Sequence, residues 1–237
     1  TYGTNVMGTL NILEGIRSIN TVRAAVMVTS DKCYKNTEGE RSYSENDPMG
    51  GHDPYSSSKG ASELLISSYR NSYYSADNYN EHKTAIASVR AGNVIGGGDW
   101  AKDRLIPDII KAFQNRKKVK IRNPNAVRPW QHVLEPLSGY IQLAELLSNS
   151  GTKYAEAWNF GPLKEDAHSV KWVVEKITEL WGNNASWMVD ENEHPHETNY
   201  LKLDCTKAFK KLNWQPKYNI EKGVRETGKW FLDLRIP

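Results

Sequence analysis

Tyr55 and Lys59 are the residues of this sequence whose types and spacing most directly suggest proton transfer. Asp53 and Pro54 stand just before them, an order typical of a helix start, because aspartate caps free amide groups and proline suits the first helical position. A spacing of four then predicts that Tyr55 and Lys59 lie on one face of that helix. A neighbouring ammonium favours the phenolate, so Tyr55 becomes a candidate proton acceptor. Taken alone, such a spacing more often reflects a partly buried tyrosine beside an exposed lysine.

A second polar group follows a short apolar run at residues 24–28. The run is rich in β-forming residues and predicts a parallel strand that is buried on both faces. Ligands of open α/β sheets bind beyond the carboxyl ends of the strands, so residues that directly follow such a strand are placed for chemistry. Those residues are Thr29, Ser30, Asp31 and Lys32. The alternative is a polar loop in which Asp31 and Lys32 are merely solvated, and only the two segments together define a candidate site.

The remaining apolar periodicity predicts an α/β protein. Residues 85–89 are a second buried-strand candidate, and the segment 90–98 leaves its carboxyl end, again on the ligand side. Shorter strands are expected at 119–121 and 158–160. Helical spacing of apolar residues predicts helices over 6–16, 105–113, 134–147 and 170–181, the last ended by Gly182.

The composition is that of an ordinary globular protein. The 237 residues are 38% hydrophobic, enough for one large or two small domains. A net charge of +3, from 31 basic and 28 acidic residues, is too balanced to favour nucleic acid or an anionic membrane as a partner. No run approaches the roughly 18 apolar residues of a membrane span. Cys33 and Cys205 are the only cysteines and lack metal-ligand spacing, so we expect a reducing, cytoplasmic compartment.

Three segments together resemble the extended short-chain dehydrogenase/reductase family. They are residues 28–34 (Val-Thr-Ser-Asp-Lys-Cys-Tyr), 55–59 (Tyr-Ser-Ser-Ser-Lys) and 90–93 (Arg-Ala-Gly-Asn), and their order and spacing are similar to those of its nucleotide-sugar dehydratases and epimerases. Within that group, residues 53–59 and the run Arg-Pro-Trp-Gln-His-Val at 128–133 look most like the branch that acts on CDP-glucose. The resemblance extends from Thr1 to about Leu232.

This resemblance implies a Rossmann-like parallel sheet, of which the chain carries only the second half, and a smaller α+β substrate-binding lobe. Residues 1–95 and 126–161 would form the NAD-binding domain, and residues 96–125 and 162–237 the sugar-nucleotide lobe. The only glycine run, Gly96-Gly97-Gly98, does not join a strand to a helix, so the Gly-rich dinucleotide fingerprint is not found. We therefore expect the chain to be the C-terminal portion of a longer enzyme.

The reaction implied by the resemblance is dehydration of CDP-glucose to a 4-keto-6-deoxy sugar nucleotide for deoxysugar and O-antigen biosynthesis, with bound NAD as a catalyst. Tyr55 would accept the proton of the C4 hydroxyl, Lys59 would hold the nicotinamide ribose, and Ser30 would hydrogen-bond the C4 oxygen. Asp31 would be the acid and Lys32 the base for loss of water across C5 and C6. A lysine acts as such a base only when desolvation or a nearby cation favours its neutral form. The Asp-Lys pair departs from the Asp-Glu pair of the commoner dTDP-glucose enzymes.

The resemblance also implies the remaining binding residues. Besides Tyr55 and Lys59, the cofactor would be contacted by Thr29 and Asn5, and the substrate by Asn93, Arg104, Arg128 and Tyr200. A guanidinium fork suits phosphate oxygens, and Arg128 is preferred over Arg104 because it begins a matched motif. Without the resemblance, Asn93 would be a turn residue nearly as readily as a substrate contact. Tyr200 would equally be a packed aromatic residue or a residue that lines the pocket.

Two alternatives stay open at this point. The enzyme could be an NAD-dependent nucleotide-sugar 4-epimerase or a dehydratase for another nucleotide, or the segment could be a non-catalytic binding or assembly module. A homodimer, through the first helix and the Tyr55 helix, is the expectation that the family carries. His194 and His196 could suggest a metal, but no third ligand of suitable spacing is present, so no metal site is expected.

Overall fold

The computed structural model describes residues 1–37, 39, 41–182, 184–192 and 201–234. The chain divides into two compact units. The first consists of Thr1–Gly92, Pro136–Gly161 and Leu203–Gln215, and the second of Asn93–Glu135, Pro162–Lys202 and Pro216–Pro237.

Three segments group otherwise than the domain boundaries expected from the sequence. Residues 93–95 and 126–135 belong to the second unit, where Val94 and Ile95 pair with Gln131 and His132. Residues 203–215 belong to the first unit, where Leu203 forms a bridge with Tyr43 and three further side chains enter a core: Ala208, Leu212 and Trp214.

A parallel three-stranded sheet forms the centre of the first unit. Its strands are β1 (Ala24–Val28), β2 (Ala85–Ala91) and β7 (Ala157–Phe160), in the order β1-β2-β7. All pairings are parallel, which confirms the predicted α/β fold. The expectation that β1 is buried on both faces is wrong, since four of its residues are half-buried and Val28 is 57% exposed. In the sheet as described, β1 lies at an edge and pairs with β2 alone, whereas β2 is flanked on both sides and its first six residues are buried.

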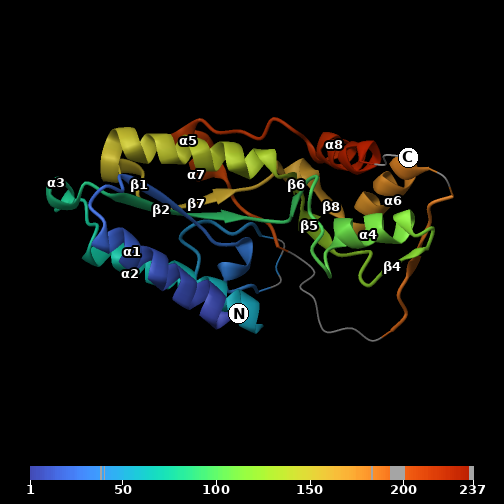
Figure 1. The fold of residues 1–237 in the computed structure, drawn as a ribbon, viewed down its shortest axis with the longest axis horizontal. Helices are drawn as coiled ribbons and strands as arrows, with labels where there is room; N and C mark the ends of the chain where they lie inside the picture. Colours follow the sequence, from blue (N-terminus) through green and yellow to red (C-terminus); the bar gives the residue numbers. More distant parts are fainter. Residues whose placement is uncertain (38, 40, 183, 193–200, 235–237) are drawn as a thin grey trace. The chain divides into compact units, whose positions relative to one another are not determined.

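Helices cover both faces of this sheet (Figure 1). On one face lie α1 (Gly8–Ser18) and α2 (Pro54–Ser72), and on the other α5 (Leu134–Ser150) and α7 (Thr206–Leu212). The α1/α2 side buries Leu13, Ile66, Tyr74 and Ile86. The α5/α7 side buries a larger set that includes Leu143, Leu147, Trp158, Phe160 and Leu212. Removal of these apolar side chains from water is the main term that holds the helices on the sheet.

The second unit has its own core, built from three helices and short strand pairs. The helices are α4 (Leu105–Gln114), α6 (Val170–Trp181) and α8 (Ile220–Asp233), and their buried side chains include Ile109, Phe113, Val173, Ile177, Val224 and Phe231. The strand pairs are β3 (Val94–Ile95) with β6 (Gln131–His132), β4 (Val119–Ile121) with β9 (Trp187–Val189), and β5 (Val127–Pro129) with β8 (Ala167–Ser169). Gly182 ends α6 as predicted, with a φ of 61° that suits glycine.

The remaining elements are short. They are the π-helical turn η1 (Gly3–Met7), the 3-10 turns η2 (Asp31–Cys33), η3 (Gly151–Tyr154) and η4 (Lys164–Asp166), and the helix α3 (Tyr79–His82). Both η1 and η2 pack against α2, which brings Asn5 and the predicted catalytic residues of η2 to one helix. Of the helices in the described part of the chain, none combines the length and apolar character needed to cross a membrane.

Candidate active site

Helix α2 begins as its sequence predicts and presents Tyr55 and Lys59 in its first two turns. The Asp53 carboxylate caps the helix, accepting hydrogen bonds from the backbone N–H of Tyr55 at 2.9 Å and of Ser56 at 3.0 Å. Pro54 occupies the first helical position. Tyr55 is 46% exposed and Lys59 is half-buried. Burial lowers the pKa of Lys59 below its usual value, whereas the negative charge of Glu63 acts in the opposite direction.

The polar residues after β1 form a tight turn. The Ser30 hydroxyl caps η2, accepting from the backbone N–H of Lys32 at 3.2 Å, and donates to Asp31 Oδ1 at 3.0 Å. The backbone N–H of Cys33 donates to the Ser30 carbonyl at 3.2 Å. Ser30 and Asp31 are buried, and Lys32 is half-buried. We call residues 30–33 the catalytic turn. Its internal hydrogen bonds fix the backbone that carries three predicted catalytic residues, Ser30, Asp31 and Lys32.

Close backbone contacts bring this turn and helix α2 together. The backbone N–H of Gly50 donates to the Cys33 carbonyl at 2.9 Å. A Cβ at Gly60, at the end of the second turn of α2, would lie 3.0 Å from the Gly50 carbonyl oxygen and 3.2 Å from that of Cys33. Such an approach is tighter than nearly all real Cβ contacts, so glycine at this position allows α2 to pack directly on the catalytic turn. The structure therefore brings the two predicted catalytic segments together within the first unit.

Beneath the turn lies a buried ion pair that our sequence analysis missed. Glu63 and Arg90 are 3% and 4% exposed, and Arg90 Nη2 lies 2.7 Å from Glu63 Oε2. The hydroxyls of Thr29 and Ser88 also donate to the Glu63 carboxylate, at 2.5 and 2.8 Å. Burial alone would raise the pKa of Glu63, but the hydrogen bonds and the charge of Arg90 hold it below its usual value. Arg90, a charged residue directly after the predicted buried strand at 85–89, was the signal that could have indicated a buried ionic partner.

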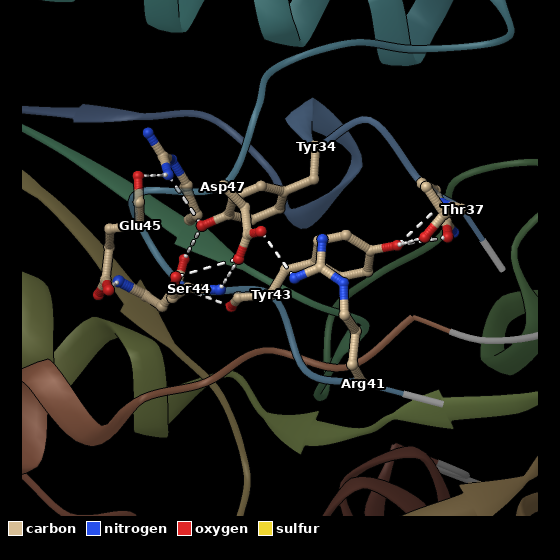
Figure 2. A network of polar contacts seen from close by, with 10 residues as sticks. Tyr34, Thr37, Arg41, Tyr43, Ser44, Glu45 and Asp47 are labelled. Carbon is tan, nitrogen blue, oxygen red and sulfur yellow. Dashed lines mark hydrogen bonds and ion pairs between the residues drawn. The ribbon is translucent and has the colours of Figure 1, made fainter. Parts of the chain in front are cut away.

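The network continues across the carboxyl ends of β2 and β7. Arg90 Nη1 donates to the Tyr34 hydroxyl at 2.8 Å, and that hydroxyl donates to Asn159 Oδ1 at 2.7 Å. The backbone N–H of Asn159 in turn donates to Glu45 at 2.8 Å. Figure 2 shows Tyr34 and Glu45 in this network, with Tyr43 beside Tyr34 at a ring-centroid distance of 5.4 Å. The segment that follows the catalytic turn is thus tied to two strands of the sheet.

The two remaining cofactor candidates lie near the same helix. Asn5 Nδ2 donates to the Ser58 hydroxyl at 2.8 Å, and the Asn5 carbonyl accepts from the Ser62 hydroxyl at 3.0 Å. Asn5 therefore fastens η1 to α2. The Thr29 hydroxyl is directed to Glu63 and is buried. Contacts of Asn5 and Thr29 with a cofactor stay predictions.

The predicted substrate-binding residues that the structure describes lie in the second unit. Arg128, on β5, is 6% exposed, and Arg104 is exposed before α4, 3.4 Å from Asp99. Asn93 is half-buried, and its carbonyl accepts from the backbone N–H of Gln131 at 3.0 Å. Tyr200 lies outside the described residues. Binding of substrate by these four residues stays a prediction.

The described part of the chain contains no group of three or more histidine, cysteine, aspartate or glutamate side chains that could hold a metal ion. His194 and His196 lie outside the described residues.

Comparisons with known proteins agree on one family. Residues 1–227 match the family described as GDP-mannose 4,6 dehydratase. The chain is 55% identical over 230 residues to CDP-glucose 4,6-dehydratase of Salmonella typhimurium, covering 97% of this chain and 64% of that protein. It is 26% identical over 249 residues to dTDP-glucose 4,6-dehydratase of Haemophilus influenzae, covering 97% and 69% of the two chains.

Solved structures show the same fold. The structure of dTDP-glucose 4,6-dehydratase from Bacillus anthracis in complex with NAD matches with a TM-score of 0.78 and 24% identity, covering 98% of this chain and 68% of that one. A UDP-galactose 4-epimerase matches with a TM-score of 0.78 and 19% identity, covering 99% and 71%. At these identities the likeness establishes the fold alone. The matched structures include a dehydratase and an epimerase, so the fold does not distinguish these two activities.

Proposed function

Because the chain belongs to the GDP-mannose 4,6-dehydratase family, we propose that it is part of an NAD-dependent CDP-glucose 4,6-dehydratase, a hydro-lyase that converts CDP-D-glucose to CDP-4-keto-6-deoxy-D-glucose and water. The observation that carries this proposal is the 55% identity to a CDP-glucose 4,6-dehydratase along nearly the whole chain. The chain spans 64% of that relative's length, so the dehydratase activity is proposed for the whole protein of which this chain is part. The packing of the catalytic turn against the Tyr55 helix supports it, because the candidate proton acceptor and the candidate acid-base pair belong to segments in contact.

The chemistry of the Tyr55 helix fits the nicotinamide half of NAD. Within the described residues, the Lys59 amino group has no hydrogen-bond or ion-pair partner, so its three N–H donors are available to ribose hydroxyls. When bound, NAD would accept the hydride from C4 of the sugar and later return it to C6. Lys59 would hold the ribose, one helical turn from Tyr55. Tyr55, which is 46% exposed, can reach a ligand and would take the proton of the C4 hydroxyl.

The catalytic turn supplies the groups for the elimination. Ser30 would turn its hydroxyl from Asp31 Oδ1 to donate a hydrogen bond to the C4 oxygen, and the ketone formed by oxidation at C4 acidifies the proton on C5. Lys32 would remove that proton, and Asp31 would protonate the C6 hydroxyl as it leaves as water. Asp31 and Lys32 are consecutive residues of the same 3-10 turn, so we expect both to act on neighbouring carbons of one sugar.

The test is an assay of the full-length protein with NAD and CDP-glucose, which follows the alkaline absorbance of the 4-keto product. We expect product from CDP-glucose and little from dTDP-glucose at the same concentration. Product from dTDP-glucose alone would assign the enzyme to another nucleotide branch. If the folded protein forms no 4-keto product from either sugar nucleotide but inverts C4, it is an epimerase.

A homodimer formed through α1 and α2 is a further part of the proposal. The two helices pack on each other around Leu13 and Ile66, which are fully buried. Their outer side nevertheless carries large apolar side chains: Met7 just before α1 is 50% exposed, Ile12 on α1 is 56% exposed, and Leu64 on α2 is 62% exposed. A second copy of the chain is the occupant that would remove the same residues from water on both partners.

A cytoplasmic location fits this proposal. Cys33 and Cys205 are both free and buried, and burial raises the pKa of each thiol above its usual value, which keeps the reactive thiolate scarce. Unpaired cysteines are the usual state in a reducing compartment.

A further inference from the structure

The catalytic turn is anchored to the protein at the residue before it and at the residue after it. Thr29 precedes Ser30, and its hydroxyl donates to Glu63 Oε1 at 2.5 Å. Tyr34 follows Cys33, and its hydroxyl accepts from Arg90 Nη1 at 2.8 Å. Both anchors end on the same ion pair, because Arg90 Nη2 and Glu63 Oε2 are 2.7 Å apart. One pair of charges therefore holds both ends of the segment that carries Ser30, Asp31 and Lys32.

The ion pair also connects this segment to the helix of the proton acceptor. Glu63 lies on α2, one turn beyond Lys59 and two turns beyond Tyr55. Arg90 lies near the end of β2, the central strand of the sheet. Any displacement of the catalytic turn relative to Tyr55 and Lys59 must therefore stretch contacts to Glu63 or to Arg90.

Burial makes these contacts costly in free energy to break. Glu63 and Arg90 are 3% and 4% exposed, so neither can exchange its partner for water without losing a charge-assisted hydrogen bond. Tyr34 is 2% exposed, and burial raises the pKa of its hydroxyl, which therefore stays a neutral donor to Asn159. Figure 2 shows Tyr34 among the polar side chains of this layer.

We propose that Glu63 and Arg90, acting through Thr29 and Tyr34, are positioning residues that set the catalytic turn against Tyr55 and Lys59. Because both side chains are buried, in this proposal they act without contacting the sugar or the cofactor. Their contribution is the alignment of the acid-base pair with the helix that accepts the first proton, and small misalignments of reacting groups cost large factors in rate. The expected effect on catalysis rests on the proposed dehydratase function. The expected effect on the structure of the catalytic turn does not.

The chain offers matched pairs of variants for the test. Thr29→Val and Ser88→Ala each remove one hydroxyl that donates to the Glu63 carboxylate, but Thr29 alone adjoins the catalytic turn. Tyr34→Phe and Tyr43→Phe each remove one buried tyrosine hydroxyl with two hydrogen-bond partners, but Tyr34 alone contacts Arg90. Both control substitutions leave the ion pair and its contacts to the turn in place.

The first readout is the steady-state rate of the full-length enzyme loaded with NAD. We expect Thr29→Val and Tyr34→Phe to lower kcat by about tenfold or more, while KM for CDP-glucose changes by less than about twofold. Thr29→Ser, which keeps the hydroxyl, should restore most of kcat. Ser88→Ala and Tyr43→Phe should stay within about twofold of the wild-type kcat. Equal losses of kcat in the controls would overturn the inference, because general loosening of the fold would then explain the effect.

The second readout is independent of turnover. The backbone N–H groups of Lys32 and Cys33 donate to Ser30, so their hydrogen exchange reports whether the turn is intact. Exchange at these two amides should be about tenfold faster in Thr29→Val and Tyr34→Phe and unchanged in both controls. Unchanged exchange in Thr29→Val and Tyr34→Phe would refute the positioning role even if the wild type converts CDP-glucose. Conversely, a wild type that forms no product but shows this exchange pattern would refute the proposed function and keep the positioning role.

Discussion

Asp31 and Lys32 are neighbours in the sequence, yet the fold gives their side chains different surroundings. Asp31 is 3% exposed and accepts a hydrogen bond from Ser30. Lys32 is half-buried and keeps contact with solvent. Two ionisable groups with unlike environments are what an elimination requires, because one must give a proton while the other takes one. This difference supports a division of labour within the catalytic turn.

The assignment of Lys32 as the base is testable in one variant. Lys32→Ala should retain oxidation at C4 but stop elimination, so bound NADH accumulates while formation of the 4-keto-6-deoxy product falls by at least about 100-fold. Single-turnover absorbance of NADH and product analysis separate the two steps. Lys35→Ala is the control, because Lys35 is an exposed lysine three residues further along. Equal loss of both steps would remove the base role from Lys32.

At the scale of elements, α2 is the helix on which the site depends. It carries Tyr55 and Lys59 near its start and Glu63 at its middle, and it packs on the catalytic turn. Its first turn is held by Asp53, which accepts from two backbone N–H groups that would otherwise have no helical partner. The position of Tyr55 therefore depends on a side chain that precedes the helix.

Loss of this cap should destabilise the helix start. Asp53→Ala should lower the free energy of unfolding by about 1 kcal/mol. It should also reduce kcat, because the backbone of Tyr55 loses a direct contact. Chemical denaturation measures the first effect and the product assay the second. Asp77→Ala, in an exposed turn after the same helix, should change neither. An Asp53→Ala protein with wild-type stability would show that the cap contributes nothing.

The Glu63–Arg90 pair predicts a pH dependence of stability with a defined sign. The pKa of Glu63 is lower in the folded protein than its usual value, so the folded state favours the carboxylate. The stabilisation is therefore present above the unfolded pKa of about 4.3 and is lost as the pH falls through the folded pKa. Glu63→Gln leaves a buried arginine without its partner and should cost about 3 to 5 kcal/mol near pH 7.

The measurement is chemical denaturation of wild type and Glu63→Gln over a range of pH. The difference between their free energies of unfolding should be largest near neutral pH and should narrow below about pH 4.3. Glu145→Gln, on the exposed side of α5, supplies a control in which the difference stays small at every pH. A constant difference for Glu63→Gln would mean that Glu63 is not ionised in the folded protein.

At the scale of the molecule, each unit buries its own core, and the first unit leaves apolar side chains exposed on both layers of helices. Leu64 on α2 and Ile141 on α5 are each 62% exposed, and they lie on opposite sides of the sheet (Figure 1). The proposed dimer uses the α1/α2 side only. Equal exposure on the two sides makes these residues a matched pair.

Dimer formation can therefore be tested by introducing a charged side chain on one side of the unit at a time. Leu64→Asp should shift the full-length protein from dimer to monomer in sedimentation velocity, because a buried unpaired carboxylate opposes association. Ile141→Asp should leave the dimer intact. A wild type that sediments as a monomer, or equal dissociation by both substitutions, would refute an interface through α1 and α2.

Local sequence patterns and matched motifs were enough to predict the elements and the candidate catalytic groups. Local patterns were sufficient for the strand at 24–28, the start of the Tyr55 helix and the glycine that ends α6, because caps, turns and periodicity act over a few residues. Matched motifs were sufficient for the family, which the comparison over residues 1–227 confirms.

Long-range packing, by contrast, sets how deeply β1 is buried and which residues support the catalytic turn. Burial of a strand depends on its neighbours in the sheet, and an apolar run does not reveal whether it lies at an edge. The Glu63–Arg90 pair joins residues 27 apart in the chain, and the bond from Tyr34 to Asn159 spans 125. Such contacts follow from the packing of helix on sheet rather than from local preference, so they became visible only once the chain was folded.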